Sequence, residues 1–280
     1  MKKISRRSFL AAAAVSAATL ALTACGGSAS TASSAAASSV AASSEAASTS
    51  TAAAELTTVE AGKLTMATNA TFPPYEMTTD AGTIEGIDVD TAQAIAEKLG
   101  LELQIDDMDF DAALLSVQQG KADIAMAGIT VTDERMAVMS FSDSYATGIQ
   151  SIIVPEGSDI TSPDDLAGKK IGTQRGTTGY IYCSDDFGDD AVVAYDDGLT
   201  AVQALNNGQV DAVVIDNAPA KEFVAANPGL VILDTSYAEE DYAIGLAKGS
   251  ALEDAVNATL EELKADGTLQ SIVDKYITAE

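Results

Sequence analysis

Arginine is scarce in the chain beyond residue 54, where Arg135 and Arg175 stand against nine lysines. Arg135 ends the run Gly128-Ile-Thr-Val-Thr-Asp-Glu-Arg135, which directly follows a strand-like stretch. A guanidinium group is a planar fork of N–H donors that matches a carboxylate in a bidentate manner. Arg135 is therefore expected either to bind the carboxylate of a ligand or to pair at the surface with Asp133 or Glu134. Its spacing alone fits both.

A second group with anion-binding chemistry is the turn Gly176-Thr-Thr-Gly179, which lies between a predicted strand and a predicted helix. Backbone N–H groups at a helix N-terminus, together with threonine hydroxyls, can donate hydrogen bonds to the same anion as Arg135. The alternative is that the turn only ends a strand.

The composition excludes several classes of function. The whole chain carries a formal charge of −27, and beyond residue 54 it has 11 basic and 41 acidic residues, a charge of −30. This charge argues against nucleic acid and polybasic membrane-surface binding. Histidine is absent and cysteine occurs twice, so histidine-based nucleophile pairs and cysteine-rich zinc sites are excluded. The composition favours a binding protein with no metal or cofactor over an enzyme.

The N-terminus has the pattern of an export signal. Basic residues at positions 2, 3, 6 and 7 precede an apolar stretch, 9–22, that is too short for a span of about 20 residues. The stretch ends in Leu22-Thr-Ala-Cys25-Gly, which resembles a bacterial lipobox and implies a lipid on Cys25. Cleavage without a lipid is the alternative, and both the general and the twin-arginine export routes stay open. We predict a signal peptide over 1–24, then Cys25 and a disordered Ala/Ser/Thr tether to about residue 60.

The remaining residues, from about 61 to 280, alternate strand and helix patterns. Asp88 is expected to cap the first helix, which would end before Gly100. This alternation predicts an α/β fold with a mostly parallel sheet. The first strands are predicted at 64–68, 101–105 and 123–127, and the first helices at 88–99 and 111–119.

A weak internal repeat supports two similar units. Gly120-Lys-Ala-Asp123 and Gly208-Gln-Val-Asp211 each follow a helix and precede a buried strand. Polar residues follow each strand, and ligands of such sheets bind beyond the carboxyl ends of the strands. Two units that face each other with these ends inward would form a cleft.

Taken together, the motifs resemble those of family 3 solute-binding proteins, the polar amino-acid receptors of ABC importers. The matching runs keep the family's order and cover essentially all of 62–280: Ala70-Thr-Phe-Pro-Pro-Tyr-Glu76, Gly86-Ile-Asp-Val-Asp90, Met108-Asp-Phe110, Gly128 to Arg135, Phe141-Ser-Asp-Ser-Tyr145, Gly176 to Gly179, Val210 to Asp216 and Leu263-Lys-Ala-Asp-Gly267. The resemblance implies a type II periplasmic-binding-protein fold with two lobes and a ligand cleft between them. Lobe one would be 62–146 plus 241–280 and lobe two 150–236, joined by a two-segment hinge.

The resemblance also implies roles for individual residues. The position of Arg135 binds the α-carboxylate of the ligand, and that of Asp216 binds the α-ammonium. Phe72 and Phe110 would enclose the ligand side chain; for these two, ordinary core packing is the alternative, and for Asp216 a strand-end cap. The remaining expected ligand-binding residues are Asn69, Gly128, Thr130, Gln174 and Thr178.

Asn69 departs from relatives that carry Asp there and bind cationic or amide side chains. Asparagine offers a donor and an acceptor but no charge, which mildly favours a neutral polar ligand over arginine or lysine. Glu76 or another acid could supply the missing charge.

The resemblance implies a monomer that captures a free amino acid by lobe closure and delivers it to an ABC permease and its ATPase. It would work outside the cytoplasm, held at the cell membrane by Cys25. Two alternatives stay open. One is an exported enzyme of the same fold, such as a cyclohexadienyl dehydratase. The other is a ligand-binding sensor, which would be expected to continue into a membrane helix, whereas this sequence ends at Glu280.

Overall fold

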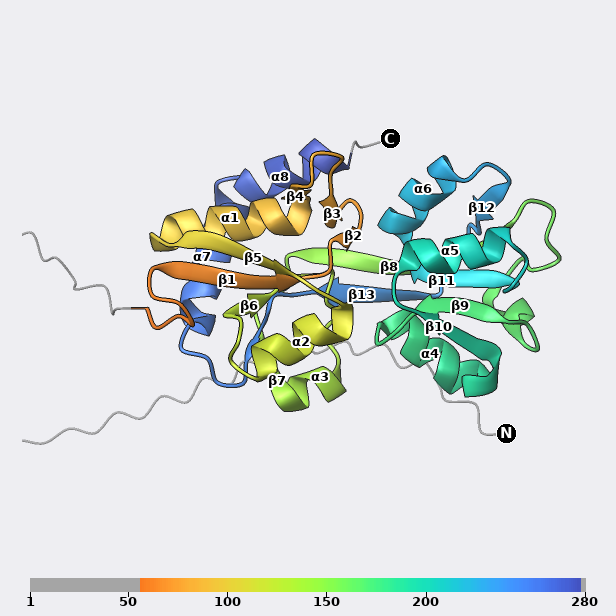
Figure 1. Cartoon of the computed structure of the whole chain (residues 1–280), viewed down its shortest axis with the longest axis horizontal. Helices are drawn as coiled ribbons and strands as arrows, with labels where there is room; N and C mark the ends of the chain where they lie inside the picture. Colours follow the sequence, from red (N-terminus) through yellow and green to blue (C-terminus); the bar gives the residue numbers. More distant parts are fainter. Residues whose placement is uncertain (1–55, 278–280) are drawn as a thin grey trace, which may run out of the picture. The chain divides into compact units, whose positions relative to one another are not determined.

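The computed structural model describes residues 56–277 (Figure 1). The predicted signal peptide, Cys25 and the tether up to residue 55 lie outside the described residues. Within the described part, no helix has both the length and the apolar character needed to cross a bilayer.

The first sheet has the strand order β5-β1-β6-β14-β7. β1 pairs in parallel with β5 and β6, whereas β14 runs antiparallel to β6 and β7. The strands are β1 (Lys63–Thr68), β5 (Glu102–Asp107), β6 (Ile124–Ala125), β7 (Met139–Phe141) and β14 (Gly245–Ala247).

Helices cover both faces of this sheet. Side chains alternate along β1, so apolar residues face both sides and need a helix packed on each. Leu64 and Met66 pack in one hydrophobic cluster with residues of α1 (Ile87–Leu99), α7 (Glu253–Ala265) and α8 (Thr268–Tyr276). Ala67 packs on the opposite face with residues of α2 (Phe110–Gln118). The short helix α3 (Asp133–Val138) follows β6 and packs near β7. We call this sheet and its helices lobe one.

The second sheet has the order β10-β9-β11-β8-β12, and β13 also pairs with β8. Its strands are β8 (Ala146–Pro155), β9 (Ile171–Gln174), β10 (Val192–Tyr195), β11 (Ala212–Asp216), β12 (Leu230–Ile232) and β13 (Ala238–Tyr242). β9, β10 and β11 are parallel, and the pairings with β8 are antiparallel. The predicted parallel arrangement is therefore confirmed for the central strands, and antiparallel strands are added at the junction.

Helices also cover both faces of the second sheet. One cluster joins Ile152 and Val214 to Cys183 of α4 (Thr178–Phe187). The opposite face carries residues of α5 (Gly198–Asn206) and α6 (Asn217–Ala226). We call this sheet and its helices lobe two. Short 3-10 helices occupy Pro163–Leu166 and Asp189–Ala191, and a small separate sheet contains β2 (Thr71–Phe72), β3 (Glu76–Thr78) and β4 (Ile84–Glu85).

Two antiparallel strands, β8 and β13, connect the lobes (Figure 1). Their register pairs Ala146 with Tyr242 and Gln150 with Ala238. β8 carries the chain out of lobe one, and β13 brings it back toward β14. The polar residues at the ends of β1, β6, β9 and β11 are thereby brought to one region between the sheets.

The aspartates of the internal repeat have matching roles. Asp123 accepts hydrogen bonds from the backbone N–H groups of Thr65 (2.8 Å) and Val59 (2.7 Å), and Asp211 accepts one from Lys170 (2.7 Å). Each aspartate therefore fixes the start of the strand next to its own, which explains why the motif recurs in both lobes.

One predicted cap is wrong. Gly86, at φ 142°, is the N-cap of α1, and Asp88 lies inside the first turn, fully buried. Its Oδ2 atom accepts a hydrogen bond from the backbone N–H of Gly128 at 3.0 Å. Gly86 is required because a Cβ there would lie 2.1 Å from the Tyr75 carbonyl oxygen. Gly100, in the left-handed conformation, ends the helix as predicted.

Candidate functional site

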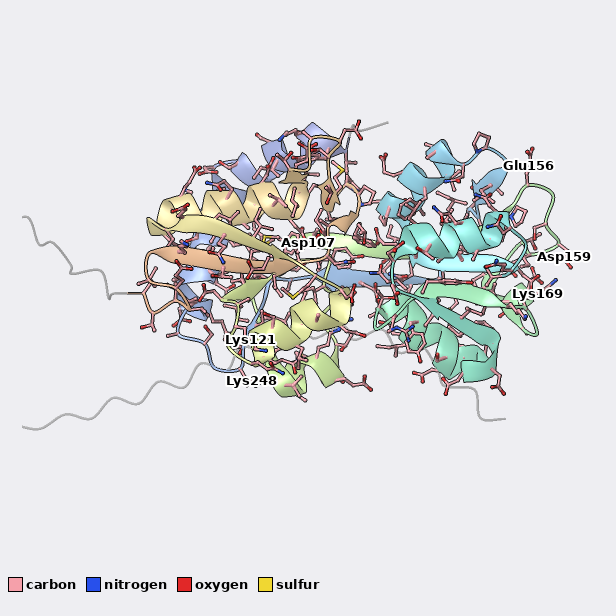
Figure 2. The ribbon with its side chains drawn as sticks, in the orientation of Figure 1. Asp107, Lys121, Glu156, Asp159, Lys169 and Lys248 are labelled. Carbon is pink, nitrogen blue, oxygen red and sulfur yellow. The ribbon has the colours of Figure 1, made fainter. Side chains whose placement is uncertain are left out.

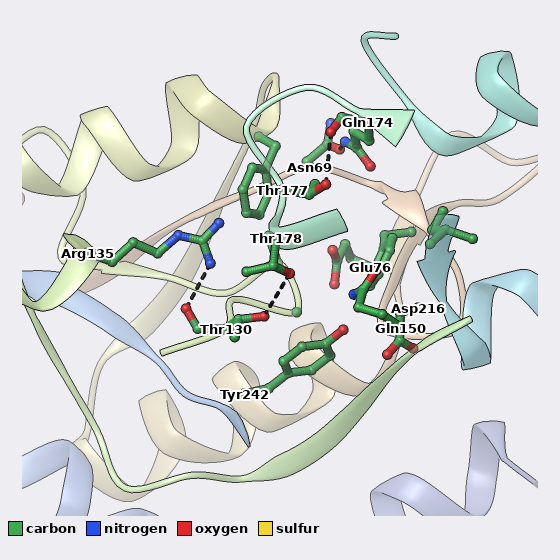
Figure 3. Close-up of a pocket in the computed structure, with 15 residues that line it drawn as sticks. Asn69, Glu76, Thr130, Arg135, Gln150, Gln174, Thr177, Thr178, Asp216 and Tyr242 are labelled. Carbon is green, nitrogen blue, oxygen red and sulfur yellow. Dashed lines mark hydrogen bonds between the residues drawn. The ribbon is translucent and has the colours of Figure 1, made fainter. Parts of the chain in front are cut away.

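A pocket between the two lobes brings together all nine residues that the sequence predicted for binding (Figure 3). The cavity is small, with a volume of about 20 Å³. The lining consists of Asn69, Phe72, Glu76, Phe110, Ala127, Gly128, Thr130, Arg135, Gln150, Gln174, Thr177, Thr178, Ile215, Asp216 and Tyr242.

Arg135 is a buried cation, with only 8% of its surface exposed. Thr132 caps α3 by accepting from the Arg135 backbone N–H, and the side chain then extends into the pocket. Nη1 donates to the carbonyl oxygen of Thr130 at 2.8 Å and Nη2 to that of Gly176 at 3.1 Å. Burial lowers the pKa of Arg135. Within residues 56–277, Arg135 forms no ion pair with a carboxylate, so surface pairing with Asp133 or Glu134 is excluded here.

Asp216 is a buried anion in the same pocket, across from Arg135 (Figure 3). It ends β11 and caps α6: Oδ1 accepts from the Ala218 N–H at 3.0 Å and Oδ2 from the Ile149 N–H at 2.7 Å. The strand-end cap is therefore present in addition to the position in the pocket. Burial raises the pKa of Asp216 to about 6, although the backbone donors oppose this change. No cationic side chain of the described residues pairs with it.

Polar contacts between lining residues cross from one lobe to the other. The Gln174 Nε2 donates to the Asn69 Oδ1 at 2.9 Å, and the Thr130 and Thr178 hydroxyls are 3.4 Å apart. Asn69 is held by its own Nδ2, which donates to the Met108 carbonyl at 3.0 Å. Asp107, labelled in Figure 2, accepts from the Ala70 N–H at 2.9 Å and fixes the same loop.

Aromatic rings form part of the wall. Phe110 lies under the Arg135 guanidinium, whose central carbon is 5.3 Å from the ring centroid. Phe72 stacks on Tyr75 with 5.9 Å between centroids. Gly128, at φ 53°, leaves room for Phe72, because a Cβ on this glycine would lie 2.8 Å from the ring. Each ring therefore has a packing role inside the protein and also faces the pocket.

Three further residues line the pocket: Glu76, which the sequence offered as a source of negative charge, and Gln150 and Tyr242, which were not predicted for the site. Glu76 is fully buried, and neither of its oxygens has a hydrogen-bond partner among the described residues. Burial and the neighbouring Asp88 raise the pKa of Glu76 well above its usual range. Gln150 and Tyr242 come from β8 and β13, which no sequence pattern assigned to the site. The only available signal was a polar Gln150 within an apolar strand.

No cluster of acidic or sulfur ligands within residues 56–277 could hold a metal ion.

Comparisons with known proteins agree with this geometry. The probable histidine-binding protein of Neisseria gonorrhoeae is 31% identical over 277 residues, which cover 96% of this chain and 95% of that protein. The L-cystine-binding protein TcyJ of Escherichia coli K12 is 32% identical over 226 residues, or 79% of this chain and 85% of the relative. Both relatives are therefore matched over most of their length.

A solved structure shares the two-lobed arrangement. An ancestral arginine-binding protein bound to glutamine is 40% identical, with a TM-score of 0.74, and the match covers 78% of this chain and 99% of that chain. The predicted type II periplasmic-binding-protein fold is thus confirmed. The model of the bacterial extracellular solute-binding proteins, family 3, matches residues 64–279, and the chain belongs to this family.

Proposed function

We propose that this protein captures a polar amino acid outside the cytoplasm and delivers it to the permease and ATPase of an ABC importer. One observation carries the proposal: the pocket holds a buried cation, Arg135, and a buried anion, Asp216, and neither forms an ion pair with a side chain of residues 56–277. A buried charge without a partner is costly. The α-carboxylate and α-ammonium of a zwitterionic amino acid would compensate both charges at once.

Lobe closure would couple binding to transport. Arg135 belongs to lobe one and Asp216 to lobe two, so one zwitterion engages both lobes and stabilises their closed arrangement. Phe72 and Phe110 would enclose the ligand side chain, and Asn69, Gly128, Thr130, Gln174 and Thr178 would supply polar contacts from both sides. The permease then receives a closed complex. Because binding alone performs this work, we propose no catalytic step.

The ligand side chain is expected to end in N–H donors. Glu76 offers two buried oxygens without partners, and Asn69 and Gln174 lie across the pocket. Burial holds the pKa of Glu76 well above its usual range, so its carboxyl would meet a neutral amide in the protonated form and would ionise beside a cationic side chain. Relatives that bind arginine, and one structure of such a protein with glutamine, support this class.

The lipid anchor at Cys25 is part of the same proposal, supported by the lipobox-like sequence. Cell fractionation tests it: the wild-type protein should remain with the membrane, and a Cys25→Ser variant should not. Recovery of both proteins in the soluble fraction would remove the anchor from the proposal and leave the binding function intact.

A ligand scan tests the binding function. Residues 55–280 are unfolded and refolded to remove carried-over ligand, and each of the twenty amino acids is then added in a thermal-shift assay. A ligand at 100 times its dissociation constant should stabilise the protein by about 2.7 kcal/mol.

Two arginine-to-lysine variants, one in the pocket and one at the surface, are compared in this scan. Arg135→Lys should weaken binding by about 10- to 100-fold, because an ammonium group cannot reproduce the guanidinium fork. Arg175→Lys should have no effect, since Arg175 is exposed and 3.7 Å from Asp196. A scan in which no amino acid stabilises the wild-type protein would refute the proposed function.

A further inference from the structure

Gln150 lies beside the proposed ammonium-binding residue. It is directly opposite Asp216 in the antiparallel pair of β8 and β11, so the two side chains point to the same face of the sheet. Both line the pocket, as Figure 3 shows, and Gln150 is only 4% exposed. A polar side chain at this depth requires hydrogen-bond partners for both ends of its amide.

Only the nitrogen end of the Gln150 amide has a partner. Nε2 donates to the Glu240 Oε2 at 3.0 Å, and Glu240 is itself buried on β13. Oε1 is shielded from solvent and has no hydrogen-bond partner among the described residues. It points toward α4, where a Cβ on Gly179 would lie 3.0 Å from it. The glycine therefore leaves space for this oxygen beside the first turn of α4.

Glu240 determines the orientation of the Gln150 amide. A carboxylate accepts hydrogen bonds and does not donate them, so the amide nitrogen turns to Glu240 and the oxygen turns away. The same Oε2 atom also accepts from the Thr130 hydroxyl at 3.1 Å, which holds the carboxylate in place. Gln150 is thus presented as an acceptor rather than as a donor.

An ammonium group has three donors, which Asp216 is poorly placed to satisfy alone. Each Asp216 oxygen already accepts one backbone N–H, from Ala218 and from Ile149. The adjacent Gln150 Oε1 has no hydrogen-bond partner among the described residues, and its side chain lines the same pocket. We propose that Gln150 Oε1 accepts a second hydrogen bond from the ligand's α-ammonium, and that Glu240 is a positioning residue that fixes its orientation. This inference rests on the proposed function.

A double-mutant cycle tests both roles. Dissociation constants for L-arginine and L-glutamine are measured by calorimetry for the wild type, Gln150→Met, Glu240→Gln and the double variant. Gln150→Met keeps the length of the side chain but removes the acceptor, and it should weaken binding at least tenfold. Glu240→Gln should weaken binding several-fold, because a neutral amide can also donate and lets the Gln150 amide turn over.

The cycle separates positioning from a general structural effect. In the Gln150→Met background, Glu240→Gln should change the dissociation constant by less than twofold, apart from any effect through Thr130. Gln203→Leu, at an exposed glutamine of α5, is the control and should bind like the wild type. Melting temperatures of the ligand-free variants identify any loss of folding.

Two results would overturn the inference: Gln150→Met binding within twofold of the wild type, or additive effects of the two substitutions. The failure of the proposed function would look different. In that case the wild-type protein itself would bind neither L-arginine nor L-glutamine, nor any other amino acid in the thermal-shift scan.

Discussion

Two buried acids, one in the pocket wall and one beside it, also hold the protein backbone in place. Asp216 caps α6 and lies in the pocket, and Asp88 fixes the Gly128 N–H that belongs to the same wall. Burial raises the pKa of each carboxyl to about 6. Without a cationic partner, burial favours the neutral form of such an acid. A cationic group beside it favours the charged form instead. The pocket should therefore respond to pH in the range from 5 to 7.

Ligand affinity and ligand-free stability should change in opposite directions with pH. The raised pKa of Asp216 makes the folded protein most stable, relative to the unfolded chain, below the unfolded pKa of about 4. This contribution to the free energy of unfolding is lost as the pH rises through about 6, the pKa in the folded protein. The melting temperature of the ligand-free protein should therefore rise between pH 7 and pH 5. Binding of the α-ammonium requires ionised Asp216, so the dissociation constant should be about tenfold larger at pH 5 than at pH 7.

Calorimetric titration across this range checks the affinity, and thermal melts check the stability. In Asp216→Asn the pH dependence of binding should become flat; a remaining slope would belong to Glu76 and Asp88. An affinity that is constant from pH 5 to pH 7 in the wild type would contradict the assignment of Asp216 to the ammonium.

The elements that carry local sequence signals were predicted well. Strand β1 and helix α1 with its Gly100 terminus follow from short-range periodicity. Motif resemblance selected nine residues, and all nine line the pocket. The binding role of these residues stays a prediction.

The connecting strands could not be predicted in the same way. β13 contains Glu239, Glu240 and Asp241, a composition that reads as a solvated loop, and it is a strand because β8 pairs with it across about 90 residues of sequence. Gln150, Glu240 and Tyr242 come from this pair, so their place near or in the site depends on long-range contacts. The prediction that Asp88 caps α1 was wrong for a related reason. Its carboxylate accepts a hydrogen bond from the backbone N–H of Gly128, which is forty residues away in the sequence.

Close packing in these connecting strands gives a prediction at the level of the element. A Cβ on Gly148 of β8 would lie 2.4 Å from the Tyr242 ring, and Tyr242 is almost fully buried. Gly148→Ala should therefore destabilise the protein by about 1–3 kcal/mol, the usual cost of overpacking. Because the displaced ring lines the pocket, the variant should also bind its ligand more weakly.

Denaturant unfolding and ligand titration of Gly148→Ala measure the two effects. Thr147→Ala, at the exposed neighbouring position, is the control and should unfold within about 0.5 kcal/mol of the wild type. If Gly148→Ala were as stable as the wild type, the Tyr242 ring would be able to move aside without loss of folding free energy.

Charge repulsion acts on the molecule as a whole. The formal charge is −27, and the ion pairs within residues 56–277 join side chains that are all at least partly exposed. One of them, Lys169 with Asp159 at 2.9 Å, lies in lobe two, away from the lobe-one residues of Figure 2. Exposed pairs contribute little, about 0–1 kcal/mol each, whereas a large net charge opposes the compact state.

Added salt should consequently stabilise the protein. The screening length falls from about 30 Å at 0.01 M to about 3 Å at 1 M, so repulsion among the acids weakens sharply. The melting temperature should rise by several degrees between 0.01 M and 0.5 M sodium chloride, and choline chloride should give the same rise if screening is the cause. A fall with salt would mean that the exposed ion pairs outweigh the net repulsion.

The direct pairing of Ala146 with Tyr242 has a consequence for how this molecule can be rebuilt. The chain leaves lobe one and re-enters it at adjacent points, so the intervening segment is a continuous insertion whose ends meet, the arrangement in which domain insertion is best tolerated. Lobe two could then be exchanged as a cassette between relatives. Arg135 would stay with the host while Asp216 and Gln174 travel with the insert. Under the proposed function, such a chimera would keep its carboxylate-binding residue and the aromatic side-chain wall, and it would acquire a new amine-binding residue.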